Sequence, residues 1–423
     1  GISSFEAVDA AKKLGIDVII TDHHETQNGL PEAYVIVNPK LDKKLESLHI
    51  LSGVGIAFKL GHGFIKYGRS KGYGGERFDL KEGLDLVALG TVADIVPLTG
   101  ENRILVKQGL KVLSRQHRPG VMALCEASGC QTTIKSTEIT FALAPRINAA
   151  GRLGDPLAAF NLLTSSNIVE ASHYAQILND YNKLRQEKED FILNEATAVL
   201  ALNPDMLDRL SIVLWGEDWH QGVIGIVASR LSKLYNRPAI IFSIKGDVAL
   251  GSGRSVTGLN LIEILSECSS LLDRFGGHPM AAGLSMKSAN LPEFMASFEK
   301  LSQKNFEEKI PPQALDIDGE IEIGDLDPEF FNSLENLEPF GHSNSQPLFL
   351  FRGLQPIKLS PAAAVHSRGY LKDYKNASIP FIAFNKPVSS FPSSGLWDVV
   401  ATPSMNYYNG SSNRQLQIVD VSE

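Results

Sequence analysis

The sequence predicts an α/β protein in which a parallel-sheet domain is joined by a long helix to a second α/β domain, and a small β-barrel follows. Three observations predict this. First, apolar runs of strand length alternate with stretches of helical spacing on both sides of one long segment. Second, that long segment keeps helical spacing throughout. Third, beyond Pro347 short strands are separated by Gly, Pro, Asn and Ser. At about 150 residues per domain, 423 residues allow several domains. We place them at 1–165, 166–205 (the connecting helix), 206–305 and 312–423.

The first domain begins with a helix and a strand. Ser3 and Glu6 have capping-box spacing, so we expect a helix from residue 3 that stops at Gly15. A buried strand at 18–21 follows and ends in a polar cluster. Because this order resembles a sheet whose preceding strand is missing, we expect an N-terminal truncation. Further elements are expected as a strand at 34–37 and helical stretches at 52–67 and 84–89.

The connecting helix begins at Asn167, which has Glu170 as a cap partner, and its apolar residues keep helical spacing for about 35 residues, or about 50 Å. Strands are expected next at 211–215 and 238–243, with a hairpin-like stretch at 248–254. The pair Pro311-Pro312 marks the boundary before the barrel.

Composition excludes several classes of protein. The 43% hydrophobic content can fill several cores, and no apolar run is long enough to cross a membrane. Three cysteines with no zinc-ligand spacing fit a reducing cytoplasm, so we expect a cytoplasmic protein without disulfides. A net charge of −8 argues against a generally basic nucleic-acid coat, so any polyanion site must be local.

The first candidate site is Asp22-His23-His24, directly after an apolar strand, where ligands of open α/β sheets gather. Imidazole and carboxylate suit Mn²⁺, Zn²⁺ or Fe²⁺. Asp94, at the end of the apolar run 91–93, is the second candidate ligand. The alternatives are a surface loop with a strand-capping aspartate, and an ordinary helix-end residue at Asp94.

Other segments could bind phosphate. The stretch 144–153 places Arg146 and Arg152 among small residues, and a flexible loop at 251–255 carries Ser252 and Arg254. A glycine turn at 276–277 precedes His278, and a polar turn containing His220 opens a helix at 223–231. The alternatives are surface salt bridges for the arginines, plain chain reversals for the glycines, and a capping or core role for His220.

Together these segments resemble the DHH phosphoesterase family, and within it the bacterial RecJ-type single-strand DNA exonucleases. The resemblance covers nearly the whole chain and rests on the order and spacing of five motifs: Thr21-Asp22-His23-His24, Ser52-Gly53-Val54 to Leu60, Gly90-Thr91-Val92-Ala93-Asp94, Pro145-Arg146 to Arg152-Leu153, and Gly276-Gly277-His278 to Gly283. It implies a parallel-sheet DHH domain, a DHHA1 domain and a C-terminal OB-fold β-barrel. Residues 337–341 resemble the junction before that barrel, although the usual Gly-Asn-Pro continuation is altered.

The resemblance also implies residue roles. His23 and Asp94 would bind metal, His24 would contact the scissile phosphate, and Asp22 would orient its neighbours. The residues that would hold phosphates of the strand are Arg146, Asn148, Arg152, Ser252, Arg254, Gly276, Gly277 and His278.

An Asp-x-Asp motif and a later aspartate of the family would lie before Gly1 and are absent from this sequence. Two hexacoordinate ions need more carboxylates than His23 and Asp94 can provide. We therefore expect this chain alone to bind the metal pair poorly, either as a fragment or as a protein that only binds strands.

The resemblance predicts a 5′ to 3′ single-stranded-DNA exonuclease in DNA repair and recombination, with two divalent ions, Mn²⁺ favoured over Mg²⁺. Single-stranded DNA is the expected partner, together with a single-strand-binding protein, for a monomer without membrane contact. Candidates for a basic, aromatic-lined surface that binds single strand are Tyr370, Tyr374, Tyr407 and Tyr408 with Lys358, Arg368, Lys372 and Arg414, and the alternative for each is a core or solvated surface residue. The alternatives are a DHH phosphodiesterase for short oligonucleotides or cyclic dinucleotides, and a non-catalytic strand-binding scaffold.

Overall fold

The computed structural model describes residues 1–26, 29–73, 78–130, 133–306, 310–312, 314–362, 365–408 and 411–423, without the side chains at 407, 408, 411 and 412. The chain divides into two compact units. The first unit comprises Gly1–Gln116, Gln131–Phe141 and Leu315–Glu423, and the second comprises His117–Cys130 and Ala142–Ala314.

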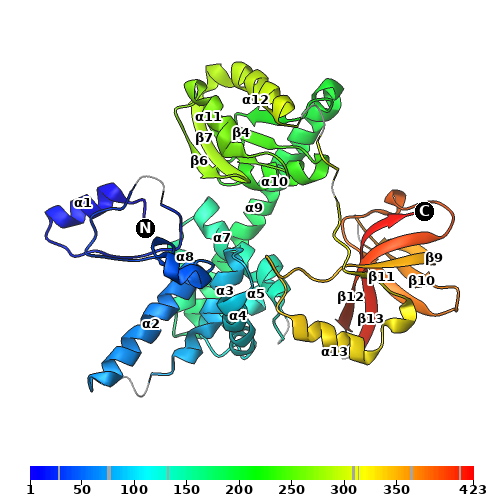
Figure 1. The fold of residues 1–423 in the computed structure, drawn as a ribbon, viewed down its shortest axis with the longest axis horizontal. Helices are drawn as coiled ribbons and strands as arrows, with labels where there is room; N and C mark the ends of the chain where they lie inside the picture. The colour runs from blue at the N-terminus through cyan, green and yellow to red at the C-terminus, as the bar shows by residue number, and fades with distance from the viewer. Residues whose placement is uncertain are drawn as a thin grey trace. The chain divides into compact units, whose positions relative to one another are not determined.

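The first unit begins with helix α1 (Phe5–Lys13) and two strands, β1 (Ile19–Thr21) and β2 (Val35–Val37), which pair in parallel (Figure 1). The capping box expected at Ser3 is wrong: the N-cap is Ser4, and its side chain makes no capping hydrogen bond. The expected stop is confirmed, because Gly15 has a left-handed φ of 70° directly after the helix.

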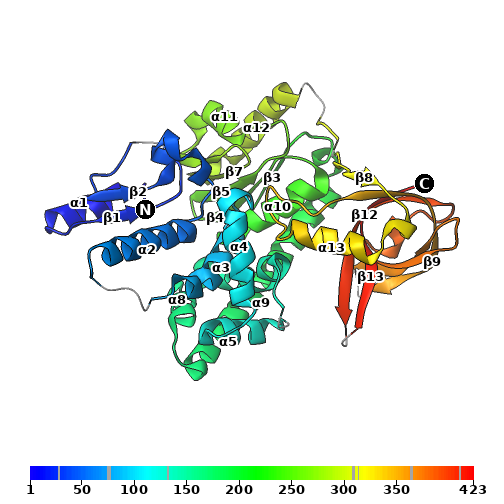
Figure 2. The same cartoon turned by 60° about the horizontal axis from the view of Figure 1, so that its bottom comes forward.

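Three helices follow, and they pack on one another through their apolar faces (Figure 2). They are α2 (Gly53–Ser70), α3 (Leu84–Ala93) and α4 (Gly100–Leu113). Helix α3 is apolar almost all round, as expected for a helix enclosed by its neighbours. The buried core of this part includes Leu51, Ile56, Val87 and Leu105.

The C-terminal part of the first unit is a β-barrel preceded by helix α13 (Pro328–Leu337) and the short strand β8 (Gly319–Glu320). Its strands are β9 (Phe349–Ala362), β10 (His366–Lys372), β11 (Ser378–Ala383), β12 (Trp397–Tyr408) and β13 (Ser411–Ser422). The order β10-β11-β13-β12-β9 closes because β9 also pairs with β10 (Figure 1). Alternate residues point inward, and the interior is filled by side chains such as Trp397, Phe351 and Leu416.

The second unit contains helices α5 (Pro119–Ser128), α7 (Ala144–Leu153) and α8 (Leu157–Thr164), which pack on the long helix α9 (Ile168–Leu202). The expectation of one long helix capped by Asn167 is confirmed: α9 has 35 residues, and the Asn167 side chain accepts a hydrogen bond from the amide of Val169.

A five-stranded sheet in the order β3-β4-β5-β7-β6 completes the second unit. The strands are β3 (Ile212–Gly216), β4 (Ala239–Lys245), β5 (Val248–Arg254), β6 (Arg274–His278) and β7 (Ala281–Lys287). One face packs on α10 (Ile224–Tyr235) and the end of α9, and the other packs on α11 (Leu261–Glu267) and α12 (Leu291–Phe306). The expected strands and hairpin of this region are confirmed.

No helix within the described ranges combines the length and the apolar character needed to cross a bilayer. Cys125, Cys130 and Cys268 are all free thiols.

Candidate functional site

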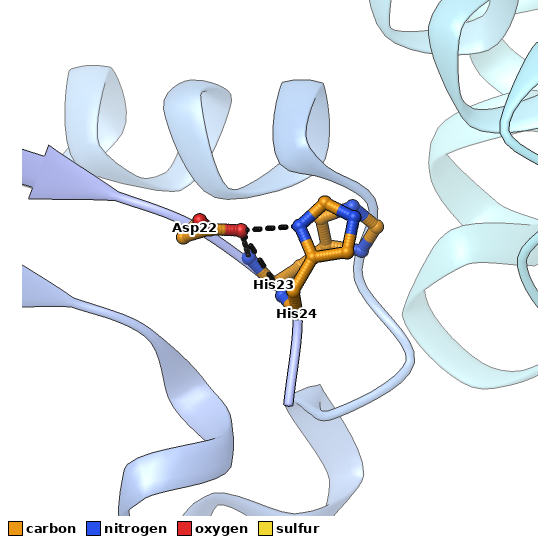
Figure 3. A group of neighbouring side chains, drawn as sticks. All are labelled: Asp22, His23 and His24. Carbon is orange, nitrogen blue, oxygen red and sulfur yellow. Dashed lines mark hydrogen bonds and ion pairs between the residues drawn. The ribbon is translucent and has the colours of Figure 1, made fainter. Parts of the chain in front are cut away.

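Asp22, His23 and His24 follow β1 at the end of its apolar run (Figure 3). The Asp22 carboxylate is buried and accepts four hydrogen bonds. Oδ2 accepts from the amide of Ile2 (2.6 Å), while Oδ1 accepts from the amides of His23 (2.7 Å) and His24 (3.0 Å). Oδ1 also lies 2.7 Å from Nδ1 of the His24 ring. This carboxylate therefore holds the turn that presents both imidazoles.

Burial alone would raise the pKa of Asp22, but the hydrogen bonds from Ile2, His24 and His23 outweigh it and hold the pKa well below its usual range. The group is ionised at neutral pH. An ionised acceptor beside Nδ1 favours the His24 tautomer that carries a proton on that nitrogen.

His23 and Asp94 lie together, as the sequence predicted. Nε2 of His23 is 3.3 Å from Oδ2 of Asp94, and the two side chains are 17% and 41% exposed. Burial lowers the pKa of His23, and this effect exceeds the opposing effect of the Asp94 charge. A neutral imidazole next to a carboxylate is a pair that can ligate a divalent ion.

Helices α2 and α3 bring this pair together. Ser52 caps α2 by accepting from the amide of Gly55 (3.2 Å), and its hydroxyl also lies 2.9 Å from the hydroxyl of Thr91 in α3. A Cβ on Gly90 would lie 2.7 Å from Cγ1 of Val54, so only glycine permits the close approach of the two helices. The small and hydroxyl residues of the two motifs thus fix the place from which Asp94 reaches His23.

The residues present fit one divalent ion. Ligand atoms of Asp22, His23 and His24 lie within 4.8 Å of one another, and two donors 3.3 Å apart can both reach one ion at about 2.0 to 2.2 Å. Asp22 is occupied by its four hydrogen bonds, which leaves His23 and Asp94 as the better ligands. Among the described residues this donor set is smaller than two hexacoordinate ions require.

A second group of predicted residues lies in the second unit. Nη1 of Arg254 donates to Oγ of Ser252 (3.2 Å) and to the carbonyl of Gly253 (2.8 Å), and Nη1 of Arg152 donates to the carbonyl of Gly222 (3.1 Å). Burial and the charge of Arg152 both lower the pKa of Arg254, so the two guanidinium groups are neighbours. Two cations near each other form a local site for a polyanion.

The N-terminus of α10 adjoins these arginines. A Cβ on Gly225 would lie 2.8 Å from Oγ of Ser252 and 3.3 Å from Nη2 of Arg254, so the first turn of the helix touches both side chains. Nδ1 of His220 accepts from the amide of Gly222 (3.1 Å), which makes His220 a capping residue of the preceding turn. The positive end of the helix dipole adds to the two guanidinium charges.

Two expectations about this region are wrong. The stretch 251–255 is not a flexible loop, since Ser252 and Arg254 belong to β5, and Gly276-Gly277 is not a turn before a helix but part of β6. The pairing of β5, β7 and β6 sets Arg254, Ala281 and His278 side by side. Both strands contain glycines that interrupt the alternation of apolar and polar residues. The sequence alone therefore does not distinguish these strands from glycine turns.

The same register places Ser252, Gly283 and Gly276 on the sheet face that carries Arg254 and His278. A Cβ on Gly276 or Gly283 would meet nothing within 4 Å, so the part of this face formed by β6 and β7 at these glycines is open. The backbone beside Arg254 is accordingly accessible to a ligand.

Arg146 is not brought into this group. The Arg146 guanidinium donates to Oδ1 of Asn179 (3.0 Å) and to the carbonyl of Ala142 (2.7 Å), and Asn148 is exposed on the same helix, α7. Arg152 lies six residues further along α7, about 600° around it, so Arg146 and Arg152 leave from different sides. Sequence reasoning did not connect Arg185 with the site, yet its charge contributes to lowering the pKa of Arg152. Its position inside the long helix gives no local signal.

The barrel carries a groove of about 680 Å³ lined in part by Tyr370, Asn406, Arg414 and Gln415. Tyr370 and Arg414 are two of the predicted strand-contacting residues. Tyr374 instead bonds Glu322 through its hydroxyl (3.2 Å). The side chains of Tyr407 and Tyr408 lie outside the described residues.

Three family models match the chain: the DHH family N-terminal domain at residues 1–91, the DHHA1 domain at 208–304 and the RecJ OB domain at 317–420. The single-stranded-DNA-specific exonuclease RecJ of Salmonella typhimurium is 36% identical over 99% of this chain and 75% of its own length, and that of Escherichia coli is 35% identical with the same coverage. The chain belongs to the RecJ family. The α/β fold with a DHH domain, a DHHA1 domain and an OB-fold barrel is thereby confirmed.

Two further RecJ proteins bear on the fold and on the extent of the chain. The crystal structure of RecJ from Thermus thermophilus in complex with Mn²⁺ matches all of this chain with a TM-score of 0.84 and 31% identity, and the chain covers 60% of that protein. RecJ of Bacillus subtilis is 36% identical over the whole chain, which spans 53% of its length. The chain thus covers between half and three quarters of these RecJ relatives.

Proposed function

We propose that the protein is a metal-dependent phosphodiesterase that hydrolyses single-stranded DNA from the 5′ end, acting in DNA repair and recombination. The observation that supports this most directly is the contact of 3.3 Å between His23 and Asp94, two residues from separate motifs of a RecJ chain. The names of the relatives, single-stranded-DNA-specific exonucleases, give the substrate class.

In this proposal His23 and Asp94 hold a divalent ion, and two ions, with Mn²⁺ preferred, form the complete centre. Crystal structures of Thermus RecJ in complex with Mn²⁺ and with Mg²⁺ support a hard divalent cation. When bound, such ions acidify water and stabilise charge that develops on phosphoryl oxygens. The remaining carboxylate ligands are residues other than Asp22, His23, His24 and Asp94.

Asp22 is a positioning residue in this proposal, and His24 contacts the scissile phosphate. The bond from Nδ1 of His24 to Asp22 leaves Nε2 on the exposed side of a ring whose side chain is 65% exposed. That nitrogen is a suitable hydrogen-bond partner for a phosphate oxygen. The hydrogen bonds that Asp22 accepts from the amides of His23 and His24 keep both rings in place before the reaction.

Arg152, Ser252 and Arg254 hold phosphates of the strand end, and His278 with Gly276 and Gly277 extends this surface across the sheet. The neighbouring guanidinium groups supply charge, and the bare face over Gly276 lets a backbone phosphate approach. Arg146, on a different side of α7, contacts a separate phosphate, and Asn148, one helical turn before Arg152, contacts a phosphate on the same side as Arg152. The 5′ to 3′ direction of cleavage is proposed from the resemblance to the RecJ family.

The barrel holds single strand along the groove that contains Tyr370 and Arg414. An aromatic ring and a guanidinium suit sequence-independent stacking, which contributes about 1 to 3 kcal/mol per base. We further propose a cytoplasmic monomer that works beside a single-strand-binding protein.

The test uses the protein as its gene encodes it, with a 5′-labelled single strand and Mn²⁺. His24→Ala should abolish cleavage and leave strand affinity largely intact. A proportional loss of both would refute the role of His24.

A strand-binding scaffold without catalysis is the second candidate, because the described donors suffice for one ion only. Cleavage by the wild-type protein under the same conditions excludes it. Binding without cleavage across Mn²⁺ and Mg²⁺ concentrations supports it.

A further inference from the structure

The loop that follows Asp94 has a strained backbone. Ile95 has a φ of 57°, in the left-handed region that a β-branched residue rarely adopts. Its side chain is exposed, so no burial of that side chain offsets the strain. Such a conformation persists only where the surrounding structure holds it, and here it directly adjoins a candidate metal ligand.

One anchor of this loop is Asn102 in α4. Its side chain is fully buried, and Nδ2 donates to the carbonyls of Pro97 (3.0 Å) and Ile50 (2.6 Å). The second bond reaches the segment just before α2, whose first residues approach His23. Asn102 therefore fixes the far end of the loop to the same region that carries the imidazole.

The other anchor is a segment that we call the clasp, residues 336–344, which lies more than 230 positions further along the chain. The amide of Leu98 donates to the carbonyl of His342 (2.8 Å). A Cβ on Gly341 would lie 2.6 Å from Cδ1 of Leu98, a side chain that is 1% exposed. The clasp therefore packs closely against Leu98, which lies four residues after Asp94.

Side chains outside the loop hold the clasp in place. Nη2 of Arg103 donates to the carbonyls of Leu337 (2.7 Å) and Asn336 (3.2 Å), which are the first residues of the clasp and the last of α13. A cation at these carbonyls also complements the helix dipole. Oγ of Ser136 donates to the carbonyl of Phe340 (2.6 Å), and Nζ of Lys135 pairs with Glu338 (2.8 Å).

We propose that the clasp positions Asp94 for metal binding, with Gly341 and Arg103 as positioning residues. The clasp holds Leu98 and thereby the strained turn at Ile95, so that the Asp94 carboxylate stays within reach of His23. This inference rests on the proposed function, because it assigns Asp94 to a metal. Since β9 starts at Phe349, a few residues after the clasp ends, the clasp connects the barrel to the metal site.

The test compares Gly341→Ala, whose new methyl group would displace Leu98, with Gly63→Ala as the matched control. A Cβ on Gly63 would meet nothing within 4 Å, so the control makes the same chemical change without a clash. Leu98→Val in the Gly341→Ala background removes the obstructing Cδ1 atom and serves as the rescue. Arg103→Ala releases the carbonyls of Asn336 and Leu337 without adding bulk.

Mn²⁺ affinity is measured from the free-Mn²⁺ electron paramagnetic resonance signal, and hydrogen exchange of the Leu98 amide reports the state of the clasp. Gly341→Ala and Arg103→Ala should each raise the Kd for Mn²⁺ by about fivefold or more and speed exchange at Leu98. The rescue should restore both values, and Gly63→Ala should change neither.

Faster exchange at Leu98 with unchanged Mn²⁺ affinity in both variants would overturn the proposal that the clasp positions Asp94, because the segment would then only attach the barrel. The proposed metal site would not be affected by that result. If Gly341→Ala does not fold, Arg103→Ala decides by the same two readouts. Mn²⁺ binding that is insensitive to His23→Ala would overturn the proposed metal site, and the clasp inference with it.

Discussion

The hydroxyl groups of Ser52 and Thr91 share a buried hydrogen bond of 2.9 Å that ties the N-terminus of α2 to α3. The two residues come from separate motifs, and neither is a candidate ligand. Their contact sets the relation between the helix beside His23 and the helix that ends at Asp94.

Thr91→Val should remove this bond while keeping the shape of the side chain. The Ser52 hydroxyl keeps its bond from the amide of Gly55, so the loss in unfolding free energy should be about 1 kcal/mol. Urea denaturation measures it. Thr137→Val, at an exposed threonine, is the control and should change stability by less than about 0.5 kcal/mol. An equal effect of both substitutions would contradict the proposed role of the buried bond.

Asp22 should make stability depend on pH on the acid side. The pKa of Asp22 is lowered in the folded state. Its contribution to the free energy of unfolding is therefore complete at a pH above the ordinary aspartate pKa of about 3.9, and it is lost as the pH falls below that pKa. Asp22→Asn, which cannot accept all four bonds, should be less stable at pH 7 and lose less on acidification. Parallel stability curves for the two proteins between pH 5 and the acid limit would argue against an ionised Asp22.

Arg254 should contribute one phosphate contact. Arg254→Ala should weaken binding of single strands of any sequence and reduce the slope of log K against log salt concentration by about 1. Fluorescence anisotropy over a salt series measures both quantities. The control is Arg352→Ala, because Arg352 is already paired with Glu320 (3.0 Å) and Asp398 (2.9 Å) and should leave the slope unchanged. Equal slopes for wild type and Arg254→Ala would exclude a phosphate contact at this residue.

Two adjacent glycines of β6 should respond differently to alanine. Gly277 has a φ of 146°, and a Cβ there would lie 2.3 Å from the carbonyl oxygen of Ala281, so Gly277→Ala should destabilise the protein by about 1 to 3 kcal/mol. Gly276→Ala adds a methyl group to the open face, so it should leave stability nearly unchanged and weaken strand binding. Thermal melts and anisotropy separate the two effects. A stability loss at Gly276 as large as that at Gly277 would show that the face is not open.

The sequence predicted the elements with strong periodicity and the convergence of distant motifs. The 35 residues of α9 repeat an apolar face long enough to exclude a strand, and the motifs that contain His23 and Asp94 led to the expected contact. It indicated a hairpin-like stretch at 248–254, yet it did not distinguish the strand at 251–254 or the strand at 276–277 from a glycine-rich loop or turn, because glycine suppresses the alternation by which strands are recognised.

Contacts that depend on tertiary packing also left no local signal. Arg146 and Arg152 share one short motif, yet the helical turn between them directs them to different neighbours. The bond from Leu98 to His342 joins positions far apart in the chain, and a backbone donor and acceptor carry no sequence mark.

The most direct test of the central claim is a double-mutant cycle of Mn²⁺ affinity for His23→Ala and Asp94→Asn, made in the protein as its gene encodes it. If both side chains bind the same ion, each single substitution should weaken Mn²⁺ binding by about tenfold or more, and the double variant should lose much less than the sum of the two free-energy changes. Two losses that add in full, or Mn²⁺ affinity that neither substitution changes, would contradict a shared metal site at His23 and Asp94.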